Sequence, residues 1–361
     1  MSILIFIVVI VALIVVHEFG HFIAAKLSGM RVDEFGLGYP PRALTFGKIG
    51  ETEYTLNWLP FGGFVKIYGE DGGTGARAFA TRPRILQAIV LVAGIAMNLV
   101  FAYVLITSAL VMGTPRALSQ SELATAQHME LAVAAVRPGS PAARAGILPG
   151  DSVMSAEDLM GTWHATDPGS FSTFVADSQG NSITLSVKHD GQLVSINATP
   201  AVSLVKSDPS RYALGVEVAT IGVVPVGFGA AITEGAQLTW DTAVLTAKGL
   251  LHFFYGVFTL SADLSQVAGP VGIAGAVGSA SAQGLGDLLS IMAVISINLA
   301  LINLIPIPAL DGGRLLFVLI ESVTRRPIKP SVARAINAAG FVALILLMVV
   351  VTAHDIFRIV G

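Results

Sequence analysis

The stretch that decides the fold is VALIVVHEFGHFIAAK, residues 11–26. It has the composition of a membrane-spanning helix, yet it contains His17, Glu18 and His21. Two imidazoles and a carboxylate are unfavourable in the hydrocarbon of a bilayer, and such residues usually mark a functional site. Positions 17 and 21 share one face of a helix because they are four residues apart. The H-E-x-x-H spacing is that of two zinc ligands and a carboxylate that activates water.

Two alternatives compete with a metal site in this helix. The first is a helix end whose polar groups reach the membrane surface, since Lys26 lies close by. That behaviour is typical of Lys and Arg rather than of a His-Glu-His cluster. The second is a cleaved signal peptide, but no basic region precedes Ile3 and the apolar run leads directly into His17. A metal ion would offset the desolvation of the imidazoles, so the metal site is the favoured interpretation.

The composition of the whole chain is that of a membrane protein. Of its 361 residues, 53% are hydrophobic and only 12% are charged, and the mean hydropathy is +0.74. The formal net charge of −3 provides no basic excess for binding nucleic acid. Because the chain has no cysteine, zinc–thiolate sites, disulfides and a cysteine nucleophile are excluded. Any metal must be held by His, Asp or Glu.

Four segments are long and apolar enough to cross a bilayer. They cover residues 2–25, 85–112, 288–305 and 335–352. Eight Lys and Arg lie from Lys26 to Arg84 and five from Arg314 to Arg334, against seven in the much longer segment between the second and third spans. Short cytosolic loops carry the excess of basic residues. We therefore expect a multi-pass protein of the inner (plasma) membrane, with its amino terminus and residues 114–284 outside the cytosol.

A β element is predicted between the first two spans. Residues 53–59 and 64–68 are strand-like, and Pro60, Gly62 and Gly63 indicate a turn between them. The apolar side chains of this hairpin or small sheet, at about 44–68, suggest contact with the membrane. Non-helical backbone at that depth must lie against protein or a cavity.

Residues 128–203 have the composition of a separate α+β domain, preceded by a polar linker at 114–127. VRPGSPAARAGILPGDSVMSA (136–156) resembles the strand–helix–loop passage of a PDZ domain, and an unrelated small α+β domain is the alternative. Asp190-Gly191 joins two alternating segments and predicts a hairpin. Residues 208–284 are expected to form amphipathic helices on the outer surface. The first two spans then belong to a segment at residues 1–113, and the last two spans belong to a segment at residues 285–361.

A second polar motif follows the third span, in SINLALINLIPIPALDGGR (296–314). Asp311 lies at the expected cytosolic end, at the depth of His17 and His21, and is the candidate for a third metal ligand. Pro306 and Pro308 prevent the helix from continuing. Gly312 and Gly313 permit a tight turn that directs Asp311 inward. The alternative role for Asp311 is a cap of the following helix.

With HEFGH at 17–21 and N-x-x-P-x-P-x-x-D-G-G at 303–313, the chain resembles the site-2 protease family of intramembrane zinc metalloproteases, and most of all the bacterial regulator-of-sigma-E proteases. The resemblance covers essentially the whole chain. It implies one zinc ion per chain, bound by His17, His21 and Asp311, with Glu18 as general base. It also implies that Asn303 holds the substrate or stabilises the oxyanion, and that Asn298, Pro306 and Pro308 contribute to substrate binding.

The resemblance is incomplete at two places. GIAMN (94–98) is similar to the family's G-P-x-x-N passage, but Ile95 replaces the proline, so no catalytic role is assigned to it. One PDZ domain is expected where enterobacterial relatives carry two, which leaves open how substrates are selected. The apolar hairpin resembles the family's membrane-reentrant β element, which is thought to pair with the substrate.

The sequence therefore predicts an α-helical polytopic membrane protein with about four transmembrane helices, a membrane-associated β-hairpin or sheet, and an inserted extracytoplasmic PDZ domain. The expected activity is cleavage of single-span membrane proteins, such as an anti-sigma factor or signal-peptide remnants. Expected partners are these substrates, the lipid bilayer, and a peptide or carboxyl terminus at the PDZ domain, but no nucleic acid. A metal-binding membrane transporter and a non-catalytic PDZ scaffold are the alternatives. Clustering of polar groups in two spans argues against transport.

Overall fold

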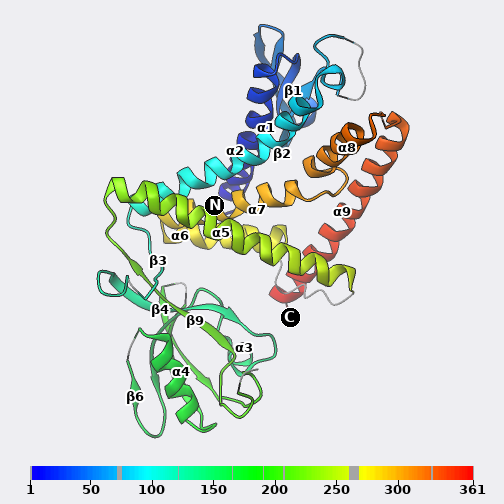
Figure 1. The fold of residues 1–361 in the computed structure, drawn as a ribbon. Coiled ribbons are helices and arrows are strands. Elements are labelled where there is room, and N and C mark those ends of the chain that lie inside the picture. Colours follow the sequence, from blue (N-terminus) through cyan, green and yellow to red (C-terminus); the bar gives the residue numbers. More distant parts are fainter. Residues whose placement is uncertain are drawn as a thin grey trace. The chain divides into compact units, whose positions relative to one another are not determined.

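The computed structural model describes residues 2–70, 75–120, 122–164, 166–189, 191–205, 208–259, 268–326 and 328–360. The chain divides into two compact units. The first combines Met1–Leu110 with Gly229–Gly361, and the second is Val111–Phe228. Most elements of the two units are labelled in Figure 1.

The helices of the first unit contain the membrane segments. They are α1 (Ser2–Leu27), α2 (Arg84–Val111), α5 (Phe228–Phe258), α6 (Pro270–Gln283), α7 (Leu285–Leu304), α8 (Asp311–Thr324) and α9 (Pro330–Val360), with a short 3-10 turn at Phe79–Thr81. Four of the described helices are long and apolar enough to cross a membrane: Ile3–Leu27, Arg84–Val111, Leu285–Leu304 and Ser331–Phe357. The four predicted spans are thus confirmed within a few residues, and the chain is a multi-pass membrane protein.

The first unit also contains a small antiparallel sheet of β1 (Val32–Ile49) and β2 (Thr52–Ile67), which lies beside α1 (Figure 1). Each of the two strands is bent into two segments, which makes a sheet of four segments. Across the sheet these lie side by side in the order 42–49, 52–57, 32–37 and 63–67. The β element was predicted at 44–68, and the structure extends it to Val32. β1 contains three glycines and two prolines, which ordinarily argue against a strand. Within the described chain, 63–67 pairs on one side only and leaves an open edge.

A buried apolar cluster fixes the end of α1 against the sheet, α2 and α8. Its buried members are Ala24, Ala25, Met30, Val32, Ile67, Phe79, Val90, Leu91 and Val318. A second cluster packs Val9 and Leu13 of α1 against Val277 of α6 and Ile295 of α7. Close-packed interiors leave little room for a helix to shift. The two clusters therefore hold the polar face of α1 in a defined position.

The second unit is a sheet with two short helices. Its strands are β3 (Arg116–Ala117), β4 (Gln127–Val136), β5 (Ser152–Glu157), β6 (Thr162–Trp163), β7 (Ile183–His189), β8 (Gln192–Ala198) and β9 (Val216–Val223), and its helices are α3 (Pro141–Ala145) and α4 (Pro168–Asp177). The strand order is β3-β9-β4-β5-β7-β8, with β6 paired to β5. The predicted hairpin is confirmed as β7–β8, although Asp190 lies outside the described residues.

Both helices of this unit begin with a side-chain cap. The Ser140 side chain accepts a hydrogen bond from the Ala143 backbone at the start of α3, and Asp167 accepts one from Ser170 at the start of α4. The core contains Leu131, Phe171 and Leu185 among its buried side chains. The unit is wider than residues 128–203, because β3 and β9 complete its sheet. Its identification as a PDZ domain stays a prediction.

Candidate active site

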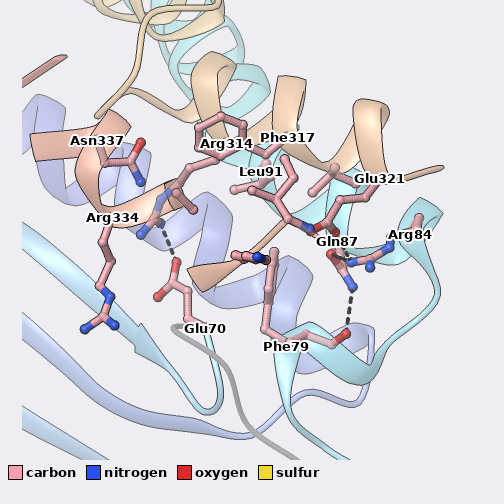
Figure 2. A pocket seen from close by; sticks show the side chains of 15 residues that line it. Glu70, Phe79, Arg84, Gln87, Leu91, Arg314, Phe317, Glu321, Arg334 and Asn337 are labelled. Atoms are coloured by element: carbon pink, nitrogen blue, oxygen red, sulfur yellow. Dashed lines mark hydrogen bonds and ion pairs between the residues drawn. The ribbon is translucent and has the colours of Figure 1, made fainter. Parts of the chain in front are cut away.

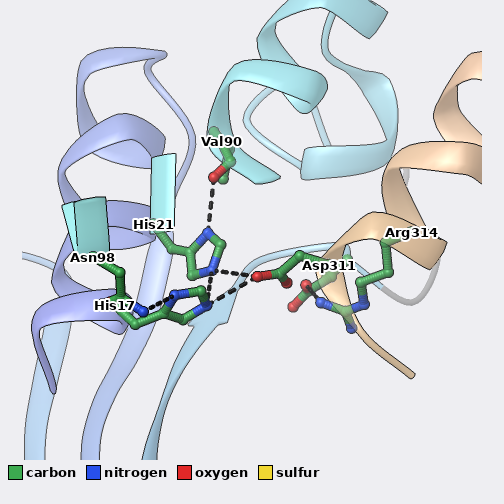
Figure 3. Close-up of polar contacts among 7 residues, drawn as sticks. His17, His21, Val90, Asn98, Asp311 and Arg314 are labelled. Carbon is green, nitrogen blue, oxygen red and sulfur yellow. Dashed lines mark hydrogen bonds and ion pairs between the residues drawn. The ribbon is translucent and has the colours of Figure 1, made fainter. Parts of the chain in front are cut away.

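Three polar side chains from distant parts of the chain converge at one point (Figure 3). The Nε2 atom of His17 lies 2.9 Å from Oδ2 of Asp311, and Nε2 of His21 lies 3.2 Å from the same oxygen. The two Nε2 atoms are 3.1 Å apart. Both histidines are buried, with exposed fractions of 8% and 7%. The structure therefore brings together the three residues that the sequence predicts to be metal ligands.

The separations of these atoms suit a small metal ion. Zinc binds His nitrogen and carboxylate oxygen at about 2.0–2.2 Å, so tetrahedral ligand atoms lie roughly 3.3–3.5 Å apart. The observed edges of 2.9–3.2 Å are only a few tenths of an ångström shorter. Of the described residues, His17, His21 and Asp311 form a group of metal-binding side chains with all ligand atoms within 4.8 Å of one another.

The tautomer of His21 supports metal binding. Its Nδ1 atom lies 2.8 Å from the backbone carbonyl oxygen of Val90. A carbonyl oxygen only accepts, so Nδ1 carries the proton and donates it, and Nε2 of the neutral ring keeps its lone pair. That lone pair faces the carboxylate of Asp311, which is also an acceptor. Buried acceptors that face one another are unfavourable, and a divalent cation between them satisfies both.

His17 has a matching partner in α2. The amide nitrogen of Asn98 lies 3.3 Å from Nδ1 of His17, while the amide oxygen of Asn98 is buried and makes no hydrogen bond to the described residues. A half-turn of the amide exchanges its nitrogen and oxygen. The oxygen then accepts the Nδ1 proton of His17, which leaves Nε2 free to bind metal. Such outer partners orient metal-binding histidines and fix their tautomer.

Glycines allow the helices to approach each other at this site. A Cβ atom at Gly94 of α2 would overlap Nε2 of His21 and lie 2.8 Å from Cε1 of His17. A Cβ at Gly20, between the two histidines of α1, would overlap the backbone carbonyl of Ala93. The pair Gly20 and Gly94 therefore lets α1 and α2 pack with the imidazoles between them.

Asp311 is positioned by the chain that precedes it. It is the first residue of α8, and Ala309 just before it has a positive φ of 76°. Added Cβ atoms at Gly312 and Gly313 would overlap the backbone carbonyls of Ile305 and Ile307. The two glycines thus allow α8 to start tightly against its own connecting loop. Close approach, rather than a left-handed turn at the glycines, is the reason that this motif needs them.

Glu18 lies beside the ligands in a cavity of about 460 Å³. The same cavity is lined by His21 and Asp311 and by residues 63–67 at the open edge of the small sheet. Val65 of this edge lines the cavity together with Glu18. The carboxylates of Glu18 and Asp311 and the imidazole of His21 are therefore placed along a strand edge that, in the described chain, pairs on one side only.

The other predicted substrate-binding residues are close in sequence to Asp311, which lines this cavity, but they do not line it themselves in the described structure. Asn298 donates to the Val294 carbonyl of its own helix at 2.9 Å. Asn303 is half-buried in the last turn of α7. Pro306 is exposed, and Pro308 packs against Gly340 of α9. Their roles stay predictions.

Several lining residues were not found from the sequence. Asn337 of α9 lines the cavity, and its side-chain oxygen accepts a hydrogen bond from the Ala309 backbone at 3.3 Å. Tyr39 of β1 also lines it, and burial raises the pKa of this tyrosine. Neither residue belongs to a spacing motif, so no local signal indicated them. The signal for Asn98 was present in GIAMN, which was set aside because Ile95 replaces a proline.

Comparison with known proteins identifies the family. The model of peptidase family M50 matches residues 5–347. The chain belongs to this family. A protein of Clostridium perfringens, provisionally named as a zinc metalloprotease, is 36% identical over 347 residues, covering 96% of this chain and 95% of the relative. One of Nostoc, with the same kind of name, is 34% identical and covers 96% of this chain and 93% of the relative.

A third relative, the zinc metalloprotease RasP of Oceanobacillus iheyensis, is 27% identical over 444 residues and covers 98% of each chain. Membership of family M50 confirms the resemblance to the site-2 proteases that the two motifs indicated. It confirms the prediction of an enzyme over the transporter and scaffold alternatives, and zinc as its cofactor.

Proposed function

We propose that the chain cleaves peptide bonds within or next to the membrane-spanning segments of other membrane proteins. As a member of family M50, it is a zinc metalloprotease. The observation that supports an intramembrane site most strongly is the convergence of His17, His21 and Asp311, because the two histidines belong to a candidate membrane span. A hydrolytic site in that position acts on substrates that are themselves in the membrane.

His17, His21 and Asp311 would hold one zinc ion, and Glu18 would act as the general base. Bound zinc lowers the pKa of a water molecule and polarises a carbonyl oxygen. Glu18 accepts a proton from the attacking water and delivers it to the nitrogen of the leaving amine. Its place in the same cavity as His21 and Asp311 supports this role.

The open edge of the small sheet suits an extended substrate. A helical substrate cannot present its carbonyls because they are hydrogen-bonded within the helix, so it must unwind locally. Residues 63–67 line the cavity next to Glu18, and an unwound segment can pair there as an added strand. Asn298, Asn303, Pro306 and Pro308 are proposed to hold the substrate from the end of α7.

The proposed location is the inner (plasma) membrane, with the active site near the cytosol and the second unit outside. The excess of basic residues from Lys26 to Arg84 supports this orientation. The second unit is proposed to act as a PDZ domain that binds a peptide or a carboxyl terminus. Such a domain would select substrates by what they present outside the membrane.

The function is tested with the full chain in detergent and two versions of a single-span substrate, one intact and one truncated on its outer side. The wild type is expected to cleave at least one version, and a zinc chelator to stop it. Glu18→Gln keeps the shape of the side chain but cannot accept a proton, so cleavage should fall by about 10²–10⁴-fold while zinc content is unchanged.

Two results would contradict the proposal. Cleavage by Glu18→Gln at the wild-type rate would exclude Glu18 as general base. Failure of the zinc-loaded wild type to cleave either substrate would exclude membrane-spanning segments as its substrates, because the truncated version removes the requirement for a first cut.

A further inference from the structure

A second cavity of about 530 Å³ adjoins the active-site cavity (Figure 2). It lies between the start of α2, one side of α8 and the start of α9. Glu70, Leu91, Arg314 and Asn337 line both cavities and form the wall between them. Neither Glu18 nor any of the three predicted metal ligands lines the second cavity, so the proposed chemical step does not use it.

Polar side chains of this lining are engaged with one another. Arg84 lies 2.8 Å from the Glu321 carboxylate and donates a hydrogen bond to the Gln87 amide oxygen at 3.0 Å. Glu70 pairs with Arg314 on the opposite side of the cavity (Figure 2). Buried polar groups are costly only when they lack a hydrogen-bond partner. These five side chains therefore do not require a polar ligand.

Another part of the lining is apolar. Phe79, Leu91, Phe317, Val318 and Ala333 contribute to it. Phe79, Leu91 and Val318 belong to the buried cluster that joins α1, the small sheet, α2 and α8, so this wall is fixed rather than adaptable. Pockets that bind small groups are lined mostly by such side chains. The cavity therefore suits an apolar side chain of limited size.

The edge segment 63–67 leads from the catalytic residues to this cavity. A Cβ at Gly63 would lie 3.6 Å from Cγ of Glu18, so the segment starts beside the proposed base. Ile67 ends β2, and its side chain belongs to the same buried cluster as the apolar wall. Glu70, just beyond it, lines both cavities. Strands rise about 3.3 Å per residue. A chain paired along this edge and cut beside Glu18 therefore reaches the second cavity about three to five residues from the cut.

From this arrangement we propose that the second cavity is a substrate subsite. It takes one large apolar side chain, such as leucine or phenylalanine, about three to five residues from the cleaved bond. The inference rests on the proposed function, because it takes residues 63–67 as the edge to which an unwound substrate pairs. The side chain lies on the side of the bond that leads toward Arg84 and Ser331, the first residues of the second and fourth candidate spans. Its contacts with the fixed wall hold the substrate in register with Glu18.

The position of the substrate is tested by disulfide crosslinking, because the chain has no cysteine of its own. Ala333→Cys is combined with Glu18→Gln in the full chain, so that bound substrate is not cut. Single-span substrates carry one cysteine at successive positions, and a disulfide forms only where two Cβ atoms come within about 3.5–4.5 Å. We expect crosslinks at positions about three to five residues from the bond that the wild type cuts. Ala335→Cys is exposed and lines neither cavity, so it should show no such preference.

The chemistry of the subsite is tested with substrates in which the residues around the cut are alanine, except for one phenylalanine at a varied position. For the wild type, phenylalanine at the crosslinked position should raise kcat/KM about tenfold by burial of its ring. The gain should appear in KM, because the contact is the same before and during the reaction. Ala333→Phe fills the cavity and should reduce this preference to about twofold or less. Ala335→Phe is the matched control and should keep the preference.

Three results would overturn the subsite. The first is crosslinking that is uniform along the substrate or equal for Ala333→Cys and Ala335→Cys. The second is cleavage by the wild type with no preference for the position of phenylalanine. The third is release of a copurified lipid by Ala333→Phe with the preference unchanged, which would identify an acyl chain as the occupant of the cavity.

Failure of the subsite differs from failure of the proposed function. Localised crosslinks to Ala333→Cys, with no substrate cut by the zinc-loaded wild type, would contradict the protease function while supporting the binding site. Cleavage without positional preference would leave the function and exclude the subsite.

Discussion

The two adjoining cavities contain similar residue types in opposite arrangements. In the active-site cavity, ligand atoms of His17, His21 and Asp311 converge within 4.8 Å, and the histidines are buried. In the second cavity, the charged groups of the described lining are spread apart, Glu70 and Glu321 each pair with an arginine, and several side chains are exposed. A divalent cation would satisfy the converging buried acceptors of the first cavity, whereas dispersed and paired charges at a surface call for none.

This difference separates a cluster that fits a catalytic metal from a cavity whose described acidic groups are paired with arginines. Ionisable side chains inside a membrane span are unfavourable without a partner, so their presence indicates function. Exposed ion pairs contribute little to stability. The first cavity should therefore be sensitive to sub-ångström changes in packing, and the second should tolerate loss of a charge.

Among changes that act through packing, the largest effect is expected from Gly94→Ala. The added Cβ would overlap Nε2 of His21 and displace both imidazoles. We expect zinc content to fall below one per chain and proteolysis to fall by about 10–100-fold, as for other changes in residues that orient metal ligands. Zinc is measured by elemental analysis of the purified protein, and proteolysis with the single-span substrate.

The matched control is Gly249→Ala in α5. A Cβ there meets no atom of the described structure within 4 Å, and alanine is the better helix former. Normal zinc content and activity are expected for this variant. If Gly94→Ala behaves in the same way as Gly249→Ala, close packing of α2 on the histidines is not required for the site.

The contrast between the cavities also explains what could be predicted from the sequence. His17, Glu18 and His21 follow from helical periodicity, and the four spans follow from hydropathy, because both are local patterns. Asp311 was found from a motif that ends a span at the same expected depth. These residues meet as predicted because span ends on one side of a membrane lie at similar depth.

Residues that contribute through packing could not be found in this way. Asn337 reaches the active site from α9, and nothing in the spacing of its sequence links it to the histidines. The GIAMN passage did point to Asn98 of α2, but not to its contact with His17. The start of β1 at Val32 was missed because its glycines and prolines obscure the strand pattern. β9 lies far along the chain from β4, its partner in the second unit, so that pairing has no local signal.

A smaller effect is expected from Glu321→Gln in the second cavity. The amide keeps an acceptor for the Ile328 backbone, which donates to Glu321 at 2.8 Å, but loses the ionic attraction to Arg84. The free energy of unfolding should fall by about 1 kcal/mol or less, with zinc content unchanged. Thermal unfolding in detergent measures the first and elemental analysis the second.

Glu51→Gln is the control for that variant. Glu51 pairs with Arg77 at 2.7 Å on the surface, where both side chains are 49% exposed, so an even smaller change is expected. Loss of zinc from Glu321→Gln but not from Glu51→Gln would show that the two cavities are coupled. That result would contradict the expectation that the second cavity tolerates loss of a charge without affecting the metal site.

X-ray absorption spectroscopy at the zinc edge tests most directly whether His17, His21 and Asp311 form the metal centre. For the wild-type chain with one zinc bound, the account predicts two imidazole nitrogens at about 2.0–2.1 Å, with oxygen as the other ligand atoms. Asp311→Ala should lose zinc or an oxygen ligand, while both imidazoles remain wherever zinc is retained. A spectrum with fewer than two imidazoles, or one that is identical in Asp311→Ala at full zinc content, would contradict the account.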